Sequence, residues 1–149
     1  MKTIILSILL IALTGSIILL GACGSASTDT SIADKPAQGT VITSGAIGNL
    51  TVTVSNDSGK LKNGEQELFL TFSDASGKPV DVGAASLNFH MPAMGTMAMM
   101  NDSAVLTTTK TPGVYKAKVK VSMPGEWQAQ IAYEGAAGSG KTSLPLRAF

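Results

Sequence analysis

The sequence of 149 residues contains one cysteine and one histidine. A single cysteine excludes a disulfide framework and any zinc or iron–sulfur site that needs several thiolates. A single histidine excludes a zinc or di-metal centre built from several imidazoles. Charge is also scarce, because 14% of the residues are charged and 11 basic against 10 acidic side chains leave a net charge of +1. Such a balance provides no basic face, which argues against a partner made of nucleic acid.

The first 22 residues are typical of an export signal. Lys2 is their only charge, and a long apolar stretch leads to Leu-Gly-Ala before Cys23. A basic start, an apolar run and small residues before a break predict a secretory signal peptide. The four residues ending at Cys23 also resemble the lipobox of bacterial lipoproteins. This resemblance implies cleavage before Cys23 and attachment of lipid to its sulfur, with the protein anchored in the cell membrane on the extracytoplasmic side. The alternative is an uncleaved helix, although about 17 apolar residues are marginal for a span.

The change in pattern along the chain predicts three regions. Residues 1–22 are the signal peptide. Residues 23–40 comprise the lipidated cysteine and a tract rich in Ser, Thr, Gly and Ala without an apolar period, which predicts a flexible tether. Residues 41–149 are the right length for a single domain.

Short runs of alternating apolar residues predict that this domain is all-β. About seven or eight strands at close spacing favour an antiparallel β-sandwich of immunoglobulin-like type. The clearest strand is predicted at 114–121, where Lys116, Lys118 and Lys120 alternate with apolar residues in what we interpret as a solvated sheet face. The other strands are predicted at 50–54, 68–72, 80–84, 87–90, 104–109, 127–133 and 142–146. The side chains predicted to form the core are Leu70, Phe72, Phe89, Val119 and Trp127.

Two further segments are predicted to lie outside strands. The acidic pair Glu65 and Glu67 stands in a stretch rich in glycine and lysine, which predicts a solvated turn. Residues 135–142 formally match the phosphate-binding pattern GxxxxGK[ST], but that motif needs a strand before it and a helix after it. Pro145 forbids such a helix, so residues 135–140 are predicted to be a loop and no nucleotide is expected.

Residues 90–100 have the most unusual composition of the chain. Five of its seven methionines lie here, within ten positions of the only histidine, His90. Thioether sulfur is soft and uncharged, so it suits Cu(I) or Ag(I) and suits Zn²⁺, Mg²⁺ or Ca²⁺ poorly. It also keeps its ligand power outside the cytoplasm, where thiolates tend to oxidise, and imidazole adds a nitrogen donor. The segment therefore predicts an extracytoplasmic copper site.

The spacing of these donors requires the segment to bend. His90 and Met94 lie about 13 Å apart in a fully extended chain, too far for one ion to bridge easily. The sequence Pro92-Ala93-Met94-Gly95 is a plausible turn that would fold the segment back. The ligands are ranked with His90, Met94 and Met97 first, Met91 and Met99 next, and Met100 last.

The segment also resembles a known family. The residues Met-Pro-Ala-Met-Gly-Thr-Met at 91–97 resemble the Met-Pro-x-Met-Gly-x-Met segment of YtkA-like domains, which are grouped with FixH-like proteins. Pro-Gly-Val-Tyr at 112–115 and Met-Pro-Gly-Glu-Trp at 123–127 follow in the order that the family shows. The resemblance runs from about residue 50 to residue 133. It implies a small extracytoplasmic β-sandwich that is linked with copper handling or with the assembly of copper-containing respiratory oxidases. A lipid would replace the transmembrane anchor of FixH-like proteins here.

Two classes of function remain, and neither is enzymatic, because no nucleophile motif surrounds His90. The first is a lipoprotein that buffers Cu(I) or Ag(I) or delivers it to a copper-accepting protein of the membrane, periplasm or cell surface. The second is a non-metal interaction or assembly module in which the methionines form a binding patch. A weaker third is a sacrificial oxidant trap, since exposed methionines oxidise reversibly.

Overall fold

The computed structural model describes residues 39–149. The predicted signal peptide, Cys23 and residues 23–38 of the predicted tether lie outside the described residues. None of the residues described belongs to a helix that is long and apolar enough to span a lipid bilayer. Between residues 39 and 149 the chain forms nine strands: β1 (Thr40–Ile47), β2 (Leu50–Asn56), β3 (Gly64–Ser73), β4 (Ala84–Met91), β5 (Met100–Ser103), β6 (Val105–Thr108), β7 (Val114–Val121), β8 (Gly125–Gly135) and β9 (Gly138–Ala148).

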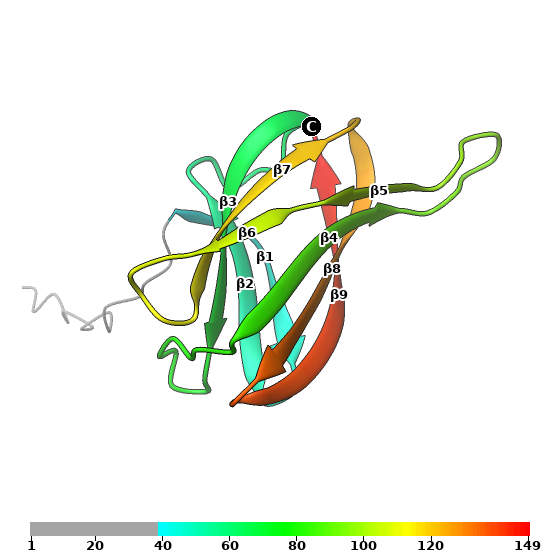
Figure 1. Ribbon diagram of the computed structural model, residues 1–149. Coiled ribbons are helices and arrows are strands. Elements are labelled where there is room, and N and C mark those ends of the chain that lie inside the picture. Colours follow the sequence, from blue (N-terminus) through cyan, green and yellow to red (C-terminus); the bar gives the residue numbers. More distant parts are fainter. Residues whose placement is uncertain (1–38) are drawn as a thin grey trace, which may run out of the picture. The chain divides into compact units, whose positions relative to one another are not determined.

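These strands form two antiparallel sheets packed face to face (Figure 1). One sheet has the strand order β1-β2-β3-β7-β6 and the other has the order β5-β4-β8-β9. When β1 is set aside, the orders match strands A-B-E-D and C′-C-F-G of an immunoglobulin-like sandwich. The predicted fold class is therefore confirmed. The described residues contain one or two strands more than predicted, in part because β1 adds an edge strand beside β2.

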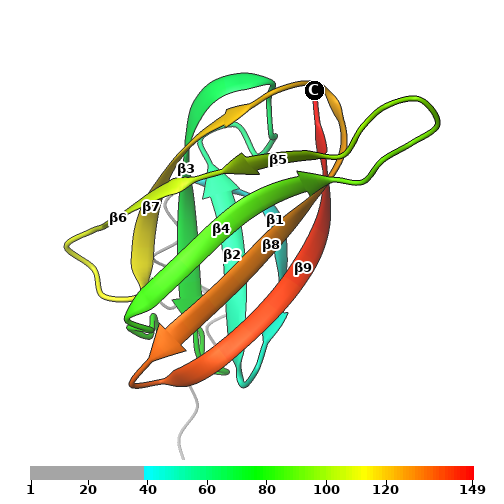
Figure 2. The same cartoon turned by 45° about the vertical axis from the view of Figure 1, so that its right-hand side comes forward.

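The strand predicted at residues 104–109 is confirmed as β6, whereas β5 just before it was not predicted. The structure has two short strands here that belong to different sheets: β5 pairs with β4, and β6 pairs with β7. Ala104 makes the crossing, and its N–H group donates a hydrogen bond of 3.0 Å to the carbonyl oxygen of Leu87 on β4. Figure 2 shows β5 and β6 following one another along this side of the sandwich.

Two local predictions are corrected. The edge strand expected at 80–84 does not form. Residues 80–83 are irregular, following an isolated bridge between Ser73 and Pro79, and β4 begins only at Ala84. The loop expected at 135–140 is a tight hairpin instead, because β8 and β9 continue until Gly135 pairs with Gly138. The segment that matches the phosphate-binding pattern is thus a β-hairpin running into β9.

The inner faces of the two sheets form one hydrophobic core. All five side chains predicted for the core are buried. Trp127 lies among them, and its indole N–H donates to the carbonyl oxygen of Met123 at 3.0 Å, so its polar edge is satisfied in the turn before β8. The ring of Phe72 is contacted edge-on by Tyr115 and Tyr133, with centroids 5.9 and 5.6 Å away. These contacts tie β3 to β7 in its own sheet and to β8 in the opposite sheet.

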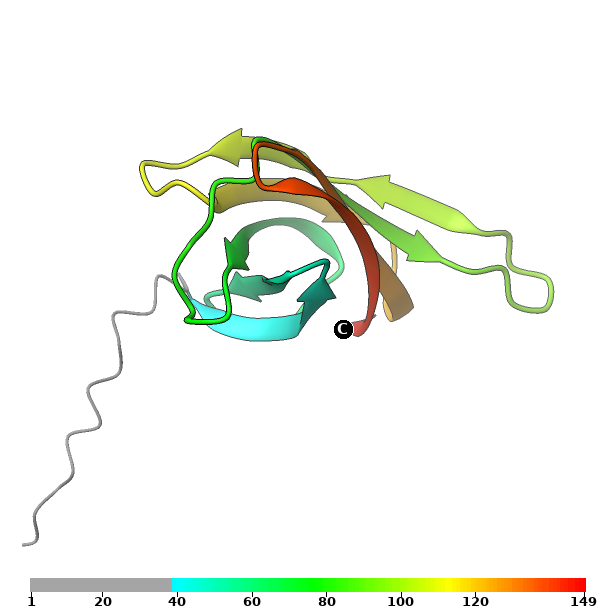
Figure 3. The same ribbon diagram turned by 90° about the horizontal axis from the view of Figure 1, so that it is seen from below.

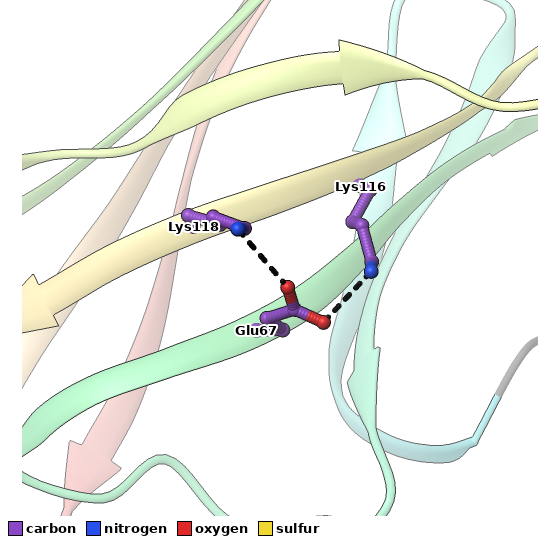
Figure 4. A network of polar contacts seen from close by, with 3 residues as sticks. All are labelled: Glu67, Lys116 and Lys118. Carbon is purple, nitrogen blue, oxygen red and sulfur yellow. Dashed lines mark ion pairs between the residues drawn. The ribbon is translucent and has the colours of Figure 1, made fainter.

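The lysine face of β7 is solvated as predicted, but its acidic partners are on a strand. Glu65 and Glu67 lie on β3 opposite Lys120 and Lys118, which corrects the predicted turn. Glu67 forms ion pairs of 2.8 Å with Lys116 and 3.5 Å with Lys118 (Figure 4). The hydrogen bond from Lys116 holds the pKa of the Glu67 carboxyl below its ordinary value. Because these groups are exposed, the pairs contribute little to stability.

A close approach of two backbone segments makes Gly113 a necessary glycine. It precedes β7 with a φ of 81°, in the left-handed region. A Cβ atom at this position would lie 2.4 Å from the carbonyl oxygen of Val80. Both the conformation and the contact therefore exclude a larger side chain.

The substitution Gly113→Ala should destabilise the domain more than Gly77→Ala. The φ of Gly77 is 82°, nearly the same, but no atom lies within 4 Å of a Cβ placed there. Gly77→Ala should therefore cost only the conformational term of about 1–2 kcal/mol. Gly113→Ala adds a clash with backbone to that term. Urea unfolding of a soluble form, residues 24–149, measures both losses, and equal losses would contradict the close approach of Val80.

Candidate metal-binding site

The segment between β4 and β5 is a hairpin that projects from the sandwich, and Figures 1, 2 and 3 all show it as a finger beyond the two sheets. We call residues 91–100 the Met hairpin. Near its tip the N–H group of Met94 donates to the carbonyl oxygen of Met97 at 3.2 Å, and the reverse bond is 2.9 Å. The chain reverses at Gly95-Thr96, with Gly95 at a φ of 58°, as the tight turns of β-hairpins require. The predicted turn over residues 92–95 is thus placed two residues too early.

One register runs through the whole hairpin. Met91 pairs with Met100, and three residues further along each arm Met94 pairs with Met97. The ladder is interrupted between these two pairs. Pro92 accounts for the interruption, because it has no N–H group to donate at a position where the alternation of bonds calls for one. Since the register is unchanged beyond Pro92, the alternation of side chains between the two faces carries through to the tip.

This alternation separates the methionines of the hairpin into two sets. Met91 and Met100 face the sandwich: Met91 is only 2% exposed, and Met100 is partly buried against the core. The terminal methyl group of Met91 packs so closely that a Cβ at Gly125 would lie 2.9 Å from it. Met94, Met97 and Met99 are 48%, 42% and 63% exposed. The structure therefore sets Met91 apart from the other predicted ligands and places it in the core.

His90 belongs with Met94, Met97 and Met99, the set that faces away from the core. It is half-buried on β4, an even number of residues from Met94, and therefore on the same face of the hairpin. Its direct partner across the ladder is Asn101, whose Oδ1 lies 2.8 Å from its Nδ1. Met99 precedes Asn101 by two residues and is therefore the diagonal neighbour of His90. Diagonal neighbours in a sheet lie about 7–8 Å apart, within reach of long side chains.

The outward face thus carries four of the predicted donors in a row, with Met99 between the Met94–Met97 pair and His90. Because the turn lies beyond Met94, His90 and Met94 stay on one extended arm, about 13 Å apart, and the predicted bend does not bring them together. Met94 and Met97 are a direct cross-strand pair, with Cα atoms about 5.5 Å apart in pairs of this type. Met99 follows Met97 on the same arm and the same face, and His90 lies diagonally beyond it. Thioether and imidazole donors suit Cu(I) or Ag(I), and the neighbouring donors are Met94 with Met97 and Met99 with His90. Among residues 39–149 no group of three or more His, Cys, Asp or Glu side chains is arranged to hold a metal ion.

The sequence did not reveal the polar residues around His90. Asn101 lies on β5, which the sequence assigned to no strand, and its amide contacts the ring directly. Asn88 continues the network along β4 through bonds to Asn101, Gln130 and Ser103. The sequence did contain a signal for this pairing. Met91, Met94, Met97 and Met100 are placed symmetrically about Gly95-Thr96. A hairpin that turns at these two residues pairs His90 with Asn101.

Comparison with known proteins identifies the family of the chain. A family model described as YtkA-like matches residues 46–132, which is more than half of the chain. The chain belongs to the YtkA-like family. The matched region of this YtkA-like protein runs from the end of β1 into β8, so it includes the whole Met hairpin. Comparison with curated proteins and with solved structures gives no match. The recognition made from the sequence motifs is confirmed.

The two sets of methionines should respond differently to truncation. Met91→Ala should destabilise this YtkA-like domain by about 2–5 kcal/mol, because it empties a filled site in the core. Met99→Ala should change the free energy of unfolding by less than about 0.5 kcal/mol, because the side chain is mostly in water. Chemical denaturation of the metal-free protein measures both values. Similar losses for the two variants would mean that the hairpin packs in a different register.

Proposed function

We propose that this YtkA-like protein is an extracytoplasmic, lipid-anchored copper-binding protein that buffers Cu(I) or delivers it to an acceptor, and takes Ag(I) as a surrogate. The acceptor would be a copper-accepting protein of the membrane, periplasm or cell surface, and the process would be oxidase assembly or copper tolerance. One observation carries the proposal: three exposed thioethers and His90 share one face of a projecting hairpin.

The exposure of these methionines needs a reason other than packing. Full burial of a methionine side chain contributes about 1.5–3 kcal/mol, and Met94, Met97 and Met99, which are 48%, 42% and 63% exposed, forgo about half of this contribution. A hairpin that served only to connect β4 and β5 would be as stable with polar residues on its outward face. Thioether sulfurs in the same positions, by contrast, could serve as ligands of a soft metal ion, a use that polar side chains do not have.

The position of the donors suits a metal that is bound and released. Met94, Met97 and Met99 lie outside the hydrophobic core, so the sandwich does not depend on their ligation. Thioethers are neutral and do not have to lose a proton before they bind, which distinguishes them from cysteine thiols. Because the hairpin projects from the sheets, an acceptor would reach the donors without any rearrangement of the strands (Figure 3). Such accessibility supports buffering or delivery rather than a structural metal.

The alternative function is an interaction module without metal. The projection of the hairpin favours it too, since residues 91–100 carry no charge and expose flexible apolar side chains, which adapt well to a partner surface. The two functions differ in what they need from methionine. A binding patch needs apolar bulk, whereas a copper site needs sulfur.

The double substitution Met94→Leu, Met97→Leu should sharply lower the affinity for Cu(I) while leaving folding intact. Leucine keeps the bulk and removes both sulfurs, and such swaps cost under about 1.5 kcal/mol each even in a core. The matched control is Met91→Leu, Met100→Leu, the inward pair of the same hairpin, which should leave Cu(I) affinity unchanged. Anaerobic Cu(I) titration of residues 24–149 against a competing chelator measures all three proteins, with Zn²⁺ as the ion that should not bind.

The same titration decides between the functions. If the outward double variant binds Cu(I) as tightly as the wild-type protein, the thioethers have no ligand role and the interaction module becomes the better proposal. Equal losses in both double variants would instead point to a general change in the hairpin.

The location of the protein rests on Cys23. The substitution Cys23→Ala should release the protein from the membrane or leave it unprocessed with its leader attached. The reason is that the sulfur atom of Cys23 would carry the lipid. Fractionation of cells that produce the full chain, with the mass of the product determined, checks this expectation. Membrane retention with an unchanged mature mass would contradict lipid anchoring.

A further inference from the structure

We propose that Asn101 is a positioning residue that holds His90 in the Nδ1–H tautomer and so leaves Nε2 as the unprotonated nitrogen. The consequence for copper rests on the proposed function, whereas the tautomer itself is a property of the metal-free protein.

The geometry around the ring supports this assignment. Nδ1 of His90 and Oδ1 of Asn101 are 2.8 Å apart across the β4–β5 ladder. An amide oxygen only accepts hydrogen bonds, so with Oδ1 of Asn101 turned towards the ring, Nδ1 is the nitrogen that carries the proton. Among the residues that the structure describes, no hydrogen bond reaches Nε2. One ring nitrogen is therefore committed to the protein and the other is left for a ligand.

The neighbouring amides are consistent with an acceptor at this point. The hydroxyl of Ser103 donates to Oδ1 of Asn88 at 3.0 Å, and the Nδ2 group of Asn88 lies on the other side of its amide. That Nδ2 group donates to Oδ1 of Asn101 at 3.4 Å and to Oε1 of Gln130 at 3.3 Å. Oδ1 of Asn101 thus lies between two donors, Asn88 and His90. If Asn101 were reversed, its own NH₂ group would face the NH₂ group of Asn88.

This arrangement matters for metal binding because a histidine ligand binds through its unprotonated nitrogen. Histidines that bind metals almost always donate their other N–H to an oxygen acceptor, which fixes both the tautomer and the orientation of the ring. A neutral imidazole without such a partner populates both tautomers. Asn101 would then prepare His90 before the ion arrives, and its loss would weaken binding without removing any ligand.

The single histidine of the chain makes the tautomer directly measurable. Two-bond ¹H–¹⁵N correlation spectra of the ¹⁵N-labelled, metal-free form (residues 24–149) report on one imidazole, and the two nitrogen shifts of the neutral ring distinguish the tautomers. The wild-type protein should show protonated Nδ1. Asn101→Leu should shift the ring towards the Nε2–H form, and Asn101→Asp, which keeps an oxygen acceptor, should restore the wild-type pattern. Asn101 is exposed, so these variants should fold.

The matched control is Gln128→Leu. Gln128 is the other cross-strand partner of His90, from β8, and its Oε1 accepts a hydrogen bond from Ser143 rather than from the ring. Its replacement should leave the tautomer unchanged. In the Cu(I) titration Asn101→Leu should lose about tenfold in affinity, at the lower end of the 10–100-fold range for partners of metal ligands. Gln128→Leu should lose none.

The results separate the inference from the function on which it rests. Protonated Nε2 in the wild-type protein, or a tautomer unaffected by Asn101→Leu, would overturn the role of Asn101 whether or not copper binds. An Asn101→Leu variant with the altered tautomer and unchanged Cu(I) affinity would overturn its role in metal binding alone. Absence of Cu(I) binding by the wild-type protein would overturn the proposed function and leave the tautomer result standing.

Discussion

The arrangement of the candidate site depends on the register in which β4 pairs with β5. A shift of one residue would exchange the two faces, so that His90 would turn towards the core and Met91 towards water. The register is fixed from both ends of β5. At one end the inward pair, Met91 and Met100, packs against the core. At the other end the crossing residue Ala104 is hydrogen-bonded to Leu87 on β4. The outward position of the donors therefore follows from how the sandwich is packed and closed.

The same residue type serves two physical purposes within one short segment. The unbranched side chain of methionine fills irregular spaces, which suits Met91 beside Gly125 and Met123 in the turn before β8. Its sulfur is also a soft ligand, a property of use only where a metal ion has access. The pleat of the hairpin assigns one purpose to each face. A count of methionines in the sequence does not separate these purposes. They are separated by whether each position lies on the same face of the hairpin as His90.

Most of the fold was predictable because a strand with one buried face has a period of two. The alternation of lysines with apolar residues in β7 and the buried row in β8 identify both the strands and their inner faces. The crossing at Ala104 was not predictable in this way, because a strand that passes from one sheet to the other needs no turn residue to mark it. Glu65 and Glu67 were misplaced because the glycine and lysine residues around them suggested a turn. Acidic residues spaced two apart are equally typical of the exposed face of a strand, which is where these two lie.

The candidate site was predictable in its chemistry and less so in its geometry. Softness of the donors follows from composition alone, whereas the ligand ranking required the position of the turn. With the turn at Pro92–Gly95, Met97 and Met99 were predicted on one side and Met100 on the other, but which thioethers face His90 was left open. The turn at Gly95-Thr96 sets Met99 beside His90 and sends Met91 inward. Proline does act in this segment, but it does so by withholding a hydrogen-bond donor in one arm rather than by reversing the chain.

The separation of the donors from the core has a consequence for how copper would be exchanged. In a domain folded around its metal, release of the ion costs folding free energy, so the metal is retained. Here the rings and aliphatic side chains of the two sheets make the core, and Met94, Met97 and Met99 take no part in it. Release from these residues would leave the sandwich unchanged. Soft ligands of an acceptor would then replace the thioethers one at a time on the open face of the hairpin, with His90 held in place by Asn101 at its base.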